Sequence, residues 1–434
     1  MNEAIRYIIQ FLLGDCGSPE IADLVGYTHS EGSFSKYKVI IVPSGFFTSN
    51  AFGTKASRPT PPFCLYSTIP ILFGSNEEQW NNNTGIIHAD IIASAFYLLS
   101  RYEEIILPMA RDEHGRFLSK DSLLHTLGWV DRPLVDYYGK LLRHWLRQAG
   151  VNIPHHKPTI HHYYLTHDVD EPYYCHSWRN IIRRTLHQQS LKDSLRMRFN
   201  PIEKDTYFTY PWLQQTNTQL IKAKGKTNVT TLYFFKAGGK APQDKPYYSL
   251  KQTALKKIIR TCKEDAQIGL HTSYSAGLNP FLIAQEKELL QHKIGQRITT
   301  NRHHFLASRE PKDFLKLQEA GIRDDFTMGF ADHAGFRLGT AHSVHFISPY
   351  DGQVHPLLLH PLTLMDATLS DPNYMNLGID EATEVCLNIA KETAKAGGEL
   401  VTLWHNSSVA KQPISMHHYQ RSLYASFIHK LTTL

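Results

Sequence analysis

Residues 162–170 read His-Tyr-Tyr-Leu-Thr-His-Asp-Val-Asp, an apolar run that ends in two carboxylates two positions apart. In an extended segment such residues lie on the same side, so Asp168 and Asp170 would face each other. Two like charges at that spacing repel each other and require a neutralising charge. A divalent cation bound by one carboxylate, with the other left free as a base, fits the pattern. An Asp-rich turn is the alternative.

Strand-like and helical runs alternate downstream of this stretch. The expected strands are 162–167, 229–235, 267–271, 298–305, 325–330, 343–347 and 400–404. The expected helices between them are 210–224, 250–264, 281–291, 311–320 and 381–396. This alternation indicates parallel βα units. It predicts an α/β fold with a closed or nearly closed barrel over residues 151–434, in which chemistry gathers at the C-terminal ends of the strands.

Residues 1–150 have a different pattern and are expected to form an N-terminal α/β accessory domain, to which we assign no activity. It opens with a helix, and Pro154 and Pro158 then bracket a short linker to the barrel. The other expected elements are a strand at 37–42, an extended run at 64–72, and helices at 86–104 and 134–148. We expect the charged residues at the end of the first of these helices, Arg101, Glu103 and Glu104, to form surface salt bridges.

The composition is that of a globular protein of more than one domain, with 434 residues, 42% hydrophobic and 20% charged. The net charge is +6, and the basic patch at 179–198 favours a solvated helix face over nucleic-acid binding. Five scattered cysteines without a Cys-x-x-Cys pair argue against disulfides and a cysteine-based zinc site. With neither a signal-peptide pattern nor a membrane-span pattern, we expect a soluble, cytoplasmic protein, and its oligomeric state stays open.

Polar side chains recur where the expected strands end or begin. Beyond the two aspartates they are His271, Arg302, His303, His304, Asp324, Asp325, His405 and Asn406. A barrel would aim these side chains into one site. Their recurrence at five strands favours a functional site over solvated surface.

Metal-assisted hydrolysis of an amide or ester is the reaction that these residues permit. Asp170 and His271 would supply two metal ligands, although a lone histidine that closes a strand is also a common core residue. The third ligand would come from His303, His304, Ser275 or another residue. Water bound to the cation would be the nucleophile, because the cation lowers its pKa.

Proton transfer would involve residues of three strands. Asp168 would accept the proton of the water, held ionised by Arg302. His405 would protonate the leaving amine, and Asp324 or Asp325 would orient that histidine.

Four segments resemble the motifs of the polysaccharide deacetylases, the carbohydrate esterases with the NodB homology domain. Leu165-Thr166-His167-Asp168-Val169-Asp170 resembles the first motif and Gly269-Leu270-His271-Thr272-Ser273 the second. Arg302-His303-His304-Phe305 resembles the third and Leu403-Trp404-His405 the last. The likeness runs from about 161 to 408 and implies a distorted (β/α)7 barrel with a glycan as the substrate. The part through Gly150 resembles that of a divergent bacterial group of long deacetylase-like proteins.

The resemblance also assigns roles, and the sequence departs from some of them. It implies that Asp168 is the base, that Asp170 and His271 bind the metal, and that His405 is the acid. Ser275 stands where the family has a second metal-binding histidine, and we expect His304 to replace it. Two further departures, His303-His304 without the usual proline and His167 in place of an aromatic residue, indicate a divergent branch. Zinc is the expected metal, with Mn, Co or Ni as alternatives.

The sequence thus predicts a metal-dependent hydrolase that removes an N-acyl group, expected to be acetyl, from a glycan or glycan precursor. One alternative is a hydrolase of a non-carbohydrate C–N bond on the same barrel, and another is a catalytically silent glycan-binding or assembly module. Tyr173, Tyr174, Trp178 and Trp404 are candidates for sugar stacking. Arg337 could contact the substrate or form a structural salt bridge.

Overall fold

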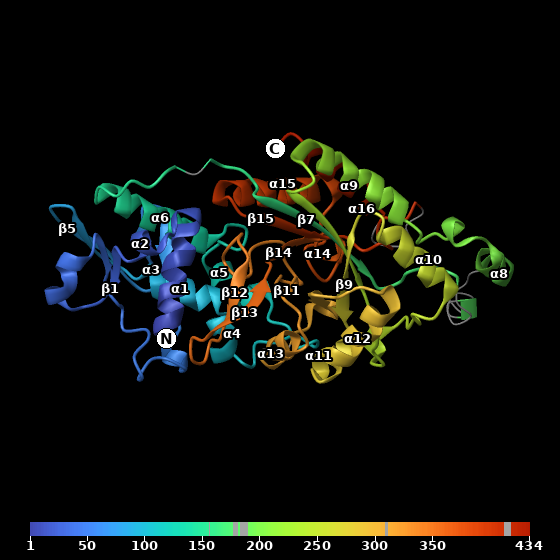
Figure 1. Ribbon diagram of the computed structural model, residues 1–434, viewed down its shortest axis with the longest axis horizontal. Helices are drawn as coiled ribbons and strands as arrows, with labels where there is room; N and C mark the ends of the chain where they lie inside the picture. Colours follow the sequence, from blue (N-terminus) through green and yellow to red (C-terminus); the bar gives the residue numbers. More distant parts are fainter. Residues whose placement is uncertain (156, 177–180, 183–189, 309–310, 412–417) are drawn as a thin grey trace.

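The computed structural model describes residues 1–155, 157–176, 181–182, 190–308, 311–411 and 418–434. The molecule is elongated, with β1 (Val25–Tyr27) and β5 (Gly74–Asn81) of the N-terminal part at one end and α8 (Leu191–Phe199) at the other (Figure 1). Part of the Arg179–Arg198 patch, with Arg179, Arg183 and Arg184, lies outside the described residues, and so does Trp178. All five cysteines are free. None of the described helices is both long enough and apolar enough to span a membrane.

A nine-stranded sheet organises the larger part of the chain, in the order β12-β13-β11-β10-β9-β8-β7-β15-β14. Its strands are β7 (His162–Val169), β8 (Val229–Phe235), β9 (Gln267–Thr272), β10 (Thr300–His303), β11 (Asp324–Asp325), β12 (Val344–Ile347), β13 (Val354–Leu359), β14 (Leu362–Met365) and β15 (Glu399–Leu403). All neighbours are parallel except β12 and β13. The carboxyl ends of eight strands therefore meet at one rim.

This sheet agrees with the expected α/β class but differs from a seven-unit barrel. It curls as an open half-barrel, and its edge strands β12 and β14 do not pair with each other among the described residues. The expected strand at 325–330 shrinks to two residues, while β13 and β14 were not expected. Pro356 lies within β13 and Pro361 directly precedes β14, and these prolines hide the strand character of both in the sequence.

Helices pack on the outer face of the sheet (Figure 1). They are α9 (Tyr210–Lys224), α10 (Thr253–Cys262), α12 (Leu282–Ile294), α13 (Lys312–Glu319), α15 (Ile379–Ala396) and α16 (Gln420–Leu431). The first five are the expected helices, to within a few residues at each end. In α10 the buried residues Leu255, Ile258, Ile259 and Cys262 follow the i, i+3, i+4, i+7 spacing of a helix with one apolar face.

The N-terminal part contains a four-stranded sheet, β1-β2-β6-β5, and a hairpin, β3-β4. Its elements are α1 (Asn2–Leu13), α2 (Pro19–Ala22), β1 (Val25–Tyr27), β2 (Val39–Ile41), β3 (Cys64–Tyr66), β4 (Ile69–Ile71), β5 (Gly74–Asn81), β6 (Thr84–Ala89), α3 (Ile91–Leu99), α4 (Tyr102–Ile106), α5 (Leu123–Thr126) and α6 (Leu134–Gln148). The expected helix at 86–104 is wrong in its first turn, which belongs to β6. Asp90 follows that strand and caps α3, because its Oδ1 accepts from the amide of Ala93 at 2.9 Å.

The charged residues at 101–104 lie at a buried junction with the larger part of the chain, and the surface location expected for them is wrong. Arg101, Glu103 and Glu104 are 3%, 5% and 8% exposed. The carboxylate of Glu104 accepts two 2.8 Å hydrogen bonds from Nη2 of Arg337. The hydrophobic core continues across this junction. The boundary at 150 stays a prediction.

Candidate metal centre

The candidate side chains meet at the carboxyl ends of the parallel strands. Asp168 and Asp170 come from the end of β7, and His271 comes from β9, where it lies in register with Arg302 of β10. His304 begins the single turn that follows β10, η7 (His304–Leu306). The parallel pairing brings together residues that are more than 130 positions apart in the chain.

Asp170, His271 and His304 form a compact group that could hold a cation. Their ligand atoms all lie within 4.8 Å of one another. Oδ1 of Asp170 is 3.2 Å from Nε2 of His271 and 3.3 Å from Nε2 of His304. Burial opposes ionisation of Asp170, but His304 and the ammonium group of Lys236 hold its pKa well below the usual value.

The donor atoms of this group fit a metal ion. Oδ1 of Asp170 and Nε2 of His271 are both buried without a hydrogen-bond partner among the described residues. The other ring nitrogen of His271, Nδ1, lies 2.9 Å from the carbonyl oxygen of Arg302. That carbonyl accepts the Nδ1 proton, so the lone pair of Nε2 points into the group, as it does in a metal-binding histidine. Carboxylate and imidazole ligands suit zinc.

His304 is held by a carboxylate that the sequence analysis missed. Nδ1 of His304 lies 3.4 Å from Oδ1 of Asp244, which leaves Nε2 facing Asp170. Ser275 is not a ligand, because its hydroxyl donates to Oδ2 of Asp244 at 2.7 Å. Burial works against ionisation of Asp244, yet hydrogen bonds from His304, Ser275 and the amide of Tyr274 lower its pKa to about 2. Ser275 therefore binds Asp244, and Asp244 in turn holds His304.

Asp168 lies beside the metal group and is bound by Arg302. Nη1 of Arg302 donates to Oδ1 of Asp168 at 2.9 Å and to the hydroxyl of Thr166 at 2.7 Å. The guanidinium is fully buried and lies 4.7 Å from the ring centre of Phe234. Oδ2 of Asp168 is 3.6 Å from Nε2 of His271. Asp168 is thus within reach of a molecule bound at the group without being part of it.

His405 completes the site from the segment after β15. Its Nε2 is 3.5 Å from Oδ2 of Asp170, and its Nδ1 lies 2.8 Å from Oδ1 of Asp366. The amide of His405 also donates to Asp366 at 2.8 Å. Burial lowers the stability of the charged ring, but Asp366 raises the pKa of His405 to about 10. His405 is therefore held next to the metal group, and Asp366 favours the charged form of its ring.

The carboxylate that orients His405 is Asp366 and neither Asp324 nor Asp325. Asp366 begins α14 (Asp366–Ser370), directly after β14. Asp325 accepts hydrogen bonds from Asn301 and Thr327 at 2.7 and 2.9 Å, and Asp324 contacts His360. The expectation for Asp324 and Asp325 was wrong because the strand that carries them, β11, is only two residues long and begins at these residues.

Lys236 is a second residue that the sequence analysis did not select. It follows β8 and is 4% exposed, with Nζ 3.8 Å from Oδ1 of Asp170. Its Nζ also donates to the carbonyl of Asp244 at 3.2 Å. Its position one residue after an apolar strand is the same signal that selected the histidines.

Several other candidates lie outside the metal group. His303 points away from it, with Nε2 3.5 Å from Oδ2 of Asp313. His167 is buried against Asn217 and the carbonyl of Trp404, and burial lowers its pKa to about 4. Tyr173, Tyr174 and Trp404 are at most 2% exposed and offer no face for sugar stacking. Arg337 was expected either to contact the substrate or to form a salt bridge, and it forms a salt bridge with Glu104.

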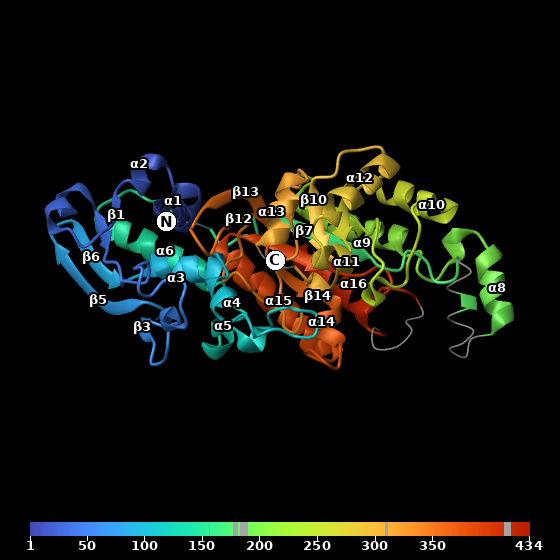
Figure 2. The same cartoon turned by 90° about the horizontal axis from the view of Figure 1, so that it is seen from below.

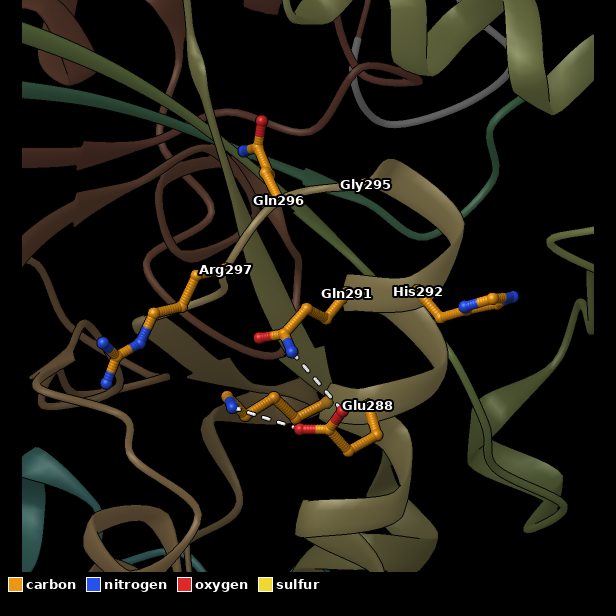
Figure 3. Close-up of a pocket in the computed structure, with 7 residues that line it drawn as sticks. Glu288, Gln291, His292, Gly295, Gln296 and Arg297 are labelled. Atoms are coloured by element: carbon orange, nitrogen blue, oxygen red, sulfur yellow. Dashed lines mark hydrogen bonds and ion pairs between the residues drawn. The ribbon is translucent and has the colours of Figure 1, made fainter.

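A surface hollow of about 560 Å³ lies at the C-terminal end of α12 (Figure 3). It is lined by Lys287, Glu288, Gln291, His292, Gly295, Gln296 and Arg297. Its lysine and glutamine bond to Glu288, as the dashed lines show. It shares no residue with the metal group.

The similarity of this chain to known proteins is distant. Residues 3–150 match the model of a family of unknown function, DUF7033. No curated protein matches the chain. A crystal structure from Mycobacterium smegmatis, provisionally described as a polysaccharide deacetylase, has a TM-score of 0.40 and 14% identity over 65% of this chain and 87% of that one. A second, from Bordetella bronchiseptica, is provisionally described as a polysaccharide deacetylase involved in O-antigen biosynthesis. Its TM-score is 0.28, with 14% identity over 62% and 89%. At these TM-scores neither likeness assigns a reaction to this chain.

Proposed function

We propose that this chain is a metal-dependent hydrolase that removes an N-acyl group, acetyl in the first instance, from a glycan or glycan precursor. The observation that carries the proposal is the group formed by Asp170, His271 and His304, in which two buried ligand atoms have no hydrogen-bond partner among the described residues. Zinc is the cation that we expect, and Mn, Co or Ni would suit the same donors. Such a cation supplies a Lewis acid that polarises the acyl oxygen and acidifies water.

The residues around the group are suited to the two proton transfers of amide hydrolysis. Asp168, paired with Arg302, accepts the proton of the attacking water. His405, an imidazolium held by Asp366, donates a proton to the nitrogen as the C–N bond breaks. The base and the acid flank Asp170, with Arg302 on one side and Asp366 on the other. Asp325 is given no part in the reaction.

The substrate class rests on the motifs that resemble those of polysaccharide deacetylases, Leu165–Asp170 and Leu403–His405 above all. A cytoplasmic location would favour lipid-linked or nucleotide-linked sugars over finished polymer. We assign no nucleic-acid partner.

The first test is the metal content of the purified protein beside Asp170→Ala and His271→Ala. We expect about one divalent ion per chain in the wild type and loss of the ion in both variants. His303→Gln is the matched control, since it changes a histidine next to His304 that points toward Asp313. Wild-type protein that holds no metal after incubation with zinc would refute the proposal and favour a silent binding module.

The second test separates the substrates. Acetate release is measured on N-acetylated oligosaccharides, on nucleotide-linked N-acetyl sugars and on small acetamides. Release from the sugars alone supports a glycan deacetylase, whereas release from the acetamides alone would move the substrate to a non-carbohydrate C–N bond.

A further inference from the structure

A loop of the N-terminal part reaches the turn that carries His304. We call residues 107–119 the junction loop, which runs between α4 and α5. Within it Arg116 is held by Asp112, whose Oδ2 accepts from Nε at 2.8 Å and pairs with Nη2 at 2.7 Å. Across the junction, Nη1 of Arg116 donates to the carbonyl oxygen of Phe305 at 3.2 Å. The loop therefore binds the backbone next to a candidate metal ligand, 189 positions away in the chain.

The turn that it binds has an unfavourable backbone conformation. Phe305 has φ 62° and Leu306 has φ 53°, in the left-handed region that side chains with a Cβ seldom adopt. Two such residues in succession persist only where the surroundings hold them. The turn places His304 so that its Nε2 faces Asp170, and a relaxed turn would move this ring.

The same guanidinium also binds the segment after α14. Nη2 of Arg116 donates to the hydroxyl of Tyr374 at 2.9 Å. This segment folds back on α14, where the amide of Met375 donates to the carbonyl of Thr368 at 3.2 Å. The first residue of α14 is Asp366, which holds His405. In Figure 2, α4 and α5 lie near the segment that carries α14.

Ring contacts reinforce the link to the turn. The ring of His114, in the junction loop, lies 4.7 Å from that of Phe305, centre to centre. The Phe305 ring in turn lies 4.8 Å from the ring of His304. The loop thus contacts both the backbone and the side chain of Phe305.

From these contacts we propose that Arg116 is a positioning residue for the metal centre. It holds the strained turn after β10 so that His304 completes the group with Asp170 and His271, and it ties this turn to the segment that follows Asp366. The inference rests on the proposed function. It gives the N-terminal part, which matches a family of unknown function, a defined task at the site.

The test measures zinc affinity, by competition with a chromogenic chelator, in the full-length wild type, in Arg116→Met and in Ser119→Ala. The control Ser119→Ala loosens the same loop, because it removes the 2.8 Å hydrogen bond to Asp332, but leaves Arg116 in place. We expect zinc binding about 10-fold weaker in Arg116→Met and unchanged in Ser119→Ala, since outer partners of metal ligands affect affinity on this scale. The free energy of unfolding of each variant is measured in parallel.

The outcomes separate the two proposals. Wild-type affinity in Arg116→Met, or equal weakening in both variants, overturns the positioning role while leaving the metal centre intact. A wild type that binds no zinc overturns the proposed function and the inference with it. If Arg116→Met does not fold, Asp112→Asn decides in its place by the same criteria. This change removes the charge that holds Arg116 but keeps an oxygen for the amides of residues 114 and 116.

Discussion

Two of the buried clusters of histidine and carboxylate on the sheet differ in whether they are complete. In the first, His360, which follows β13, lies between Glu399 at the start of β15 and Asp324 at the start of β11, with ring nitrogens 2.7 and 3.2 Å from carboxylate oxygens. At the rim where strands end, Asp170 and His271 each have a buried atom without a hydrogen-bond partner among the described residues. The first cluster is a closed ion network, whereas the second has ligand atoms that could hold a cation.

The largest effect that we expect is at the incomplete cluster. His304→Ala removes one of three ligands and should abolish zinc binding, because the two that remain are too few for a tight site. Ser275→Ala should keep the ion, since Ser275 bonds to Asp244 and not to the group. Metal content after dialysis measures both. Retention of metal in His304→Ala with loss in Ser275→Ala would reverse the assignment of the third ligand.

Next in size is the loss of the proposed base. Asp168→Asn should lower kcat/KM by about 10²- to 10⁴-fold while zinc remains bound, because the amide keeps an oxygen for Arg302 but cannot take up a proton. Acetate release and metal content are measured on the same preparation. Unchanged activity would show that the base is another group.

The closed cluster predicts a dependence of stability on pH. Burial disfavours the charged ring, but Glu399 and Asp324 raise the pKa of His360 from 6.5 to about 9. A raised pKa stabilises the fold fully below pH 6.5, and this contribution is lost as pH rises through 9. We expect the free energy of unfolding to fall by about 3 kcal/mol over that range. His360→Gln should lack this decline when chemical unfolding is compared at pH 6 and pH 9.5, and a parallel decline would contradict the assignment.

The smallest effect should distinguish the two partners of His360. Glu399 is 9% exposed in its side chain and lies 2.7 Å from the ring, whereas Asp324 is 32% exposed at 3.2 Å. Asp324→Asn should cost about 1 kcal/mol or less in unfolding free energy, because water screens the more exposed pair. Glu399→Gln should cost more, since it leaves a buried charge without its closer partner. Equal costs would mean that solvent exposure does not determine how much each of the two ion pairs contributes to the free energy of unfolding.

The incomplete cluster is also the part of the site closest to what the sequence predicted. Asp168, Asp170, His271 and His405 were selected because each ends an apolar run, and parallel strands bring such ends to one rim. Asp366 went unnoticed because the strand before it, β14, is not recognisable in the sequence. This strand lies between Pro361 and a short helix and has no alternation of apolar and polar residues. Asp244 lies in a loop, where no periodicity marks a functional residue.

For the charged residues at 101–104, too, the local sequence does not reveal the tertiary contact. Their sequence is that of a solvated helix end, and nothing local indicates that Arg337 lies opposite Glu104. The junction loop is a similar case, since Arg116 finds Phe305 and Tyr374 only because two distant parts of the chain pack together.

The sequence by itself determined the alternation of strands and helices and the polar residues at the strand ends, because backbone periodicity and burial are written in the local pattern of apolar side chains. Tertiary structure alone decided which carboxylate holds which histidine: Asp366 for His405, Asp244 for His304, and Glu399 for His360. These pairs are separated by 39, 60 and 39 residues, and a hydrogen bond depends on distance in space, which sequence separation does not encode.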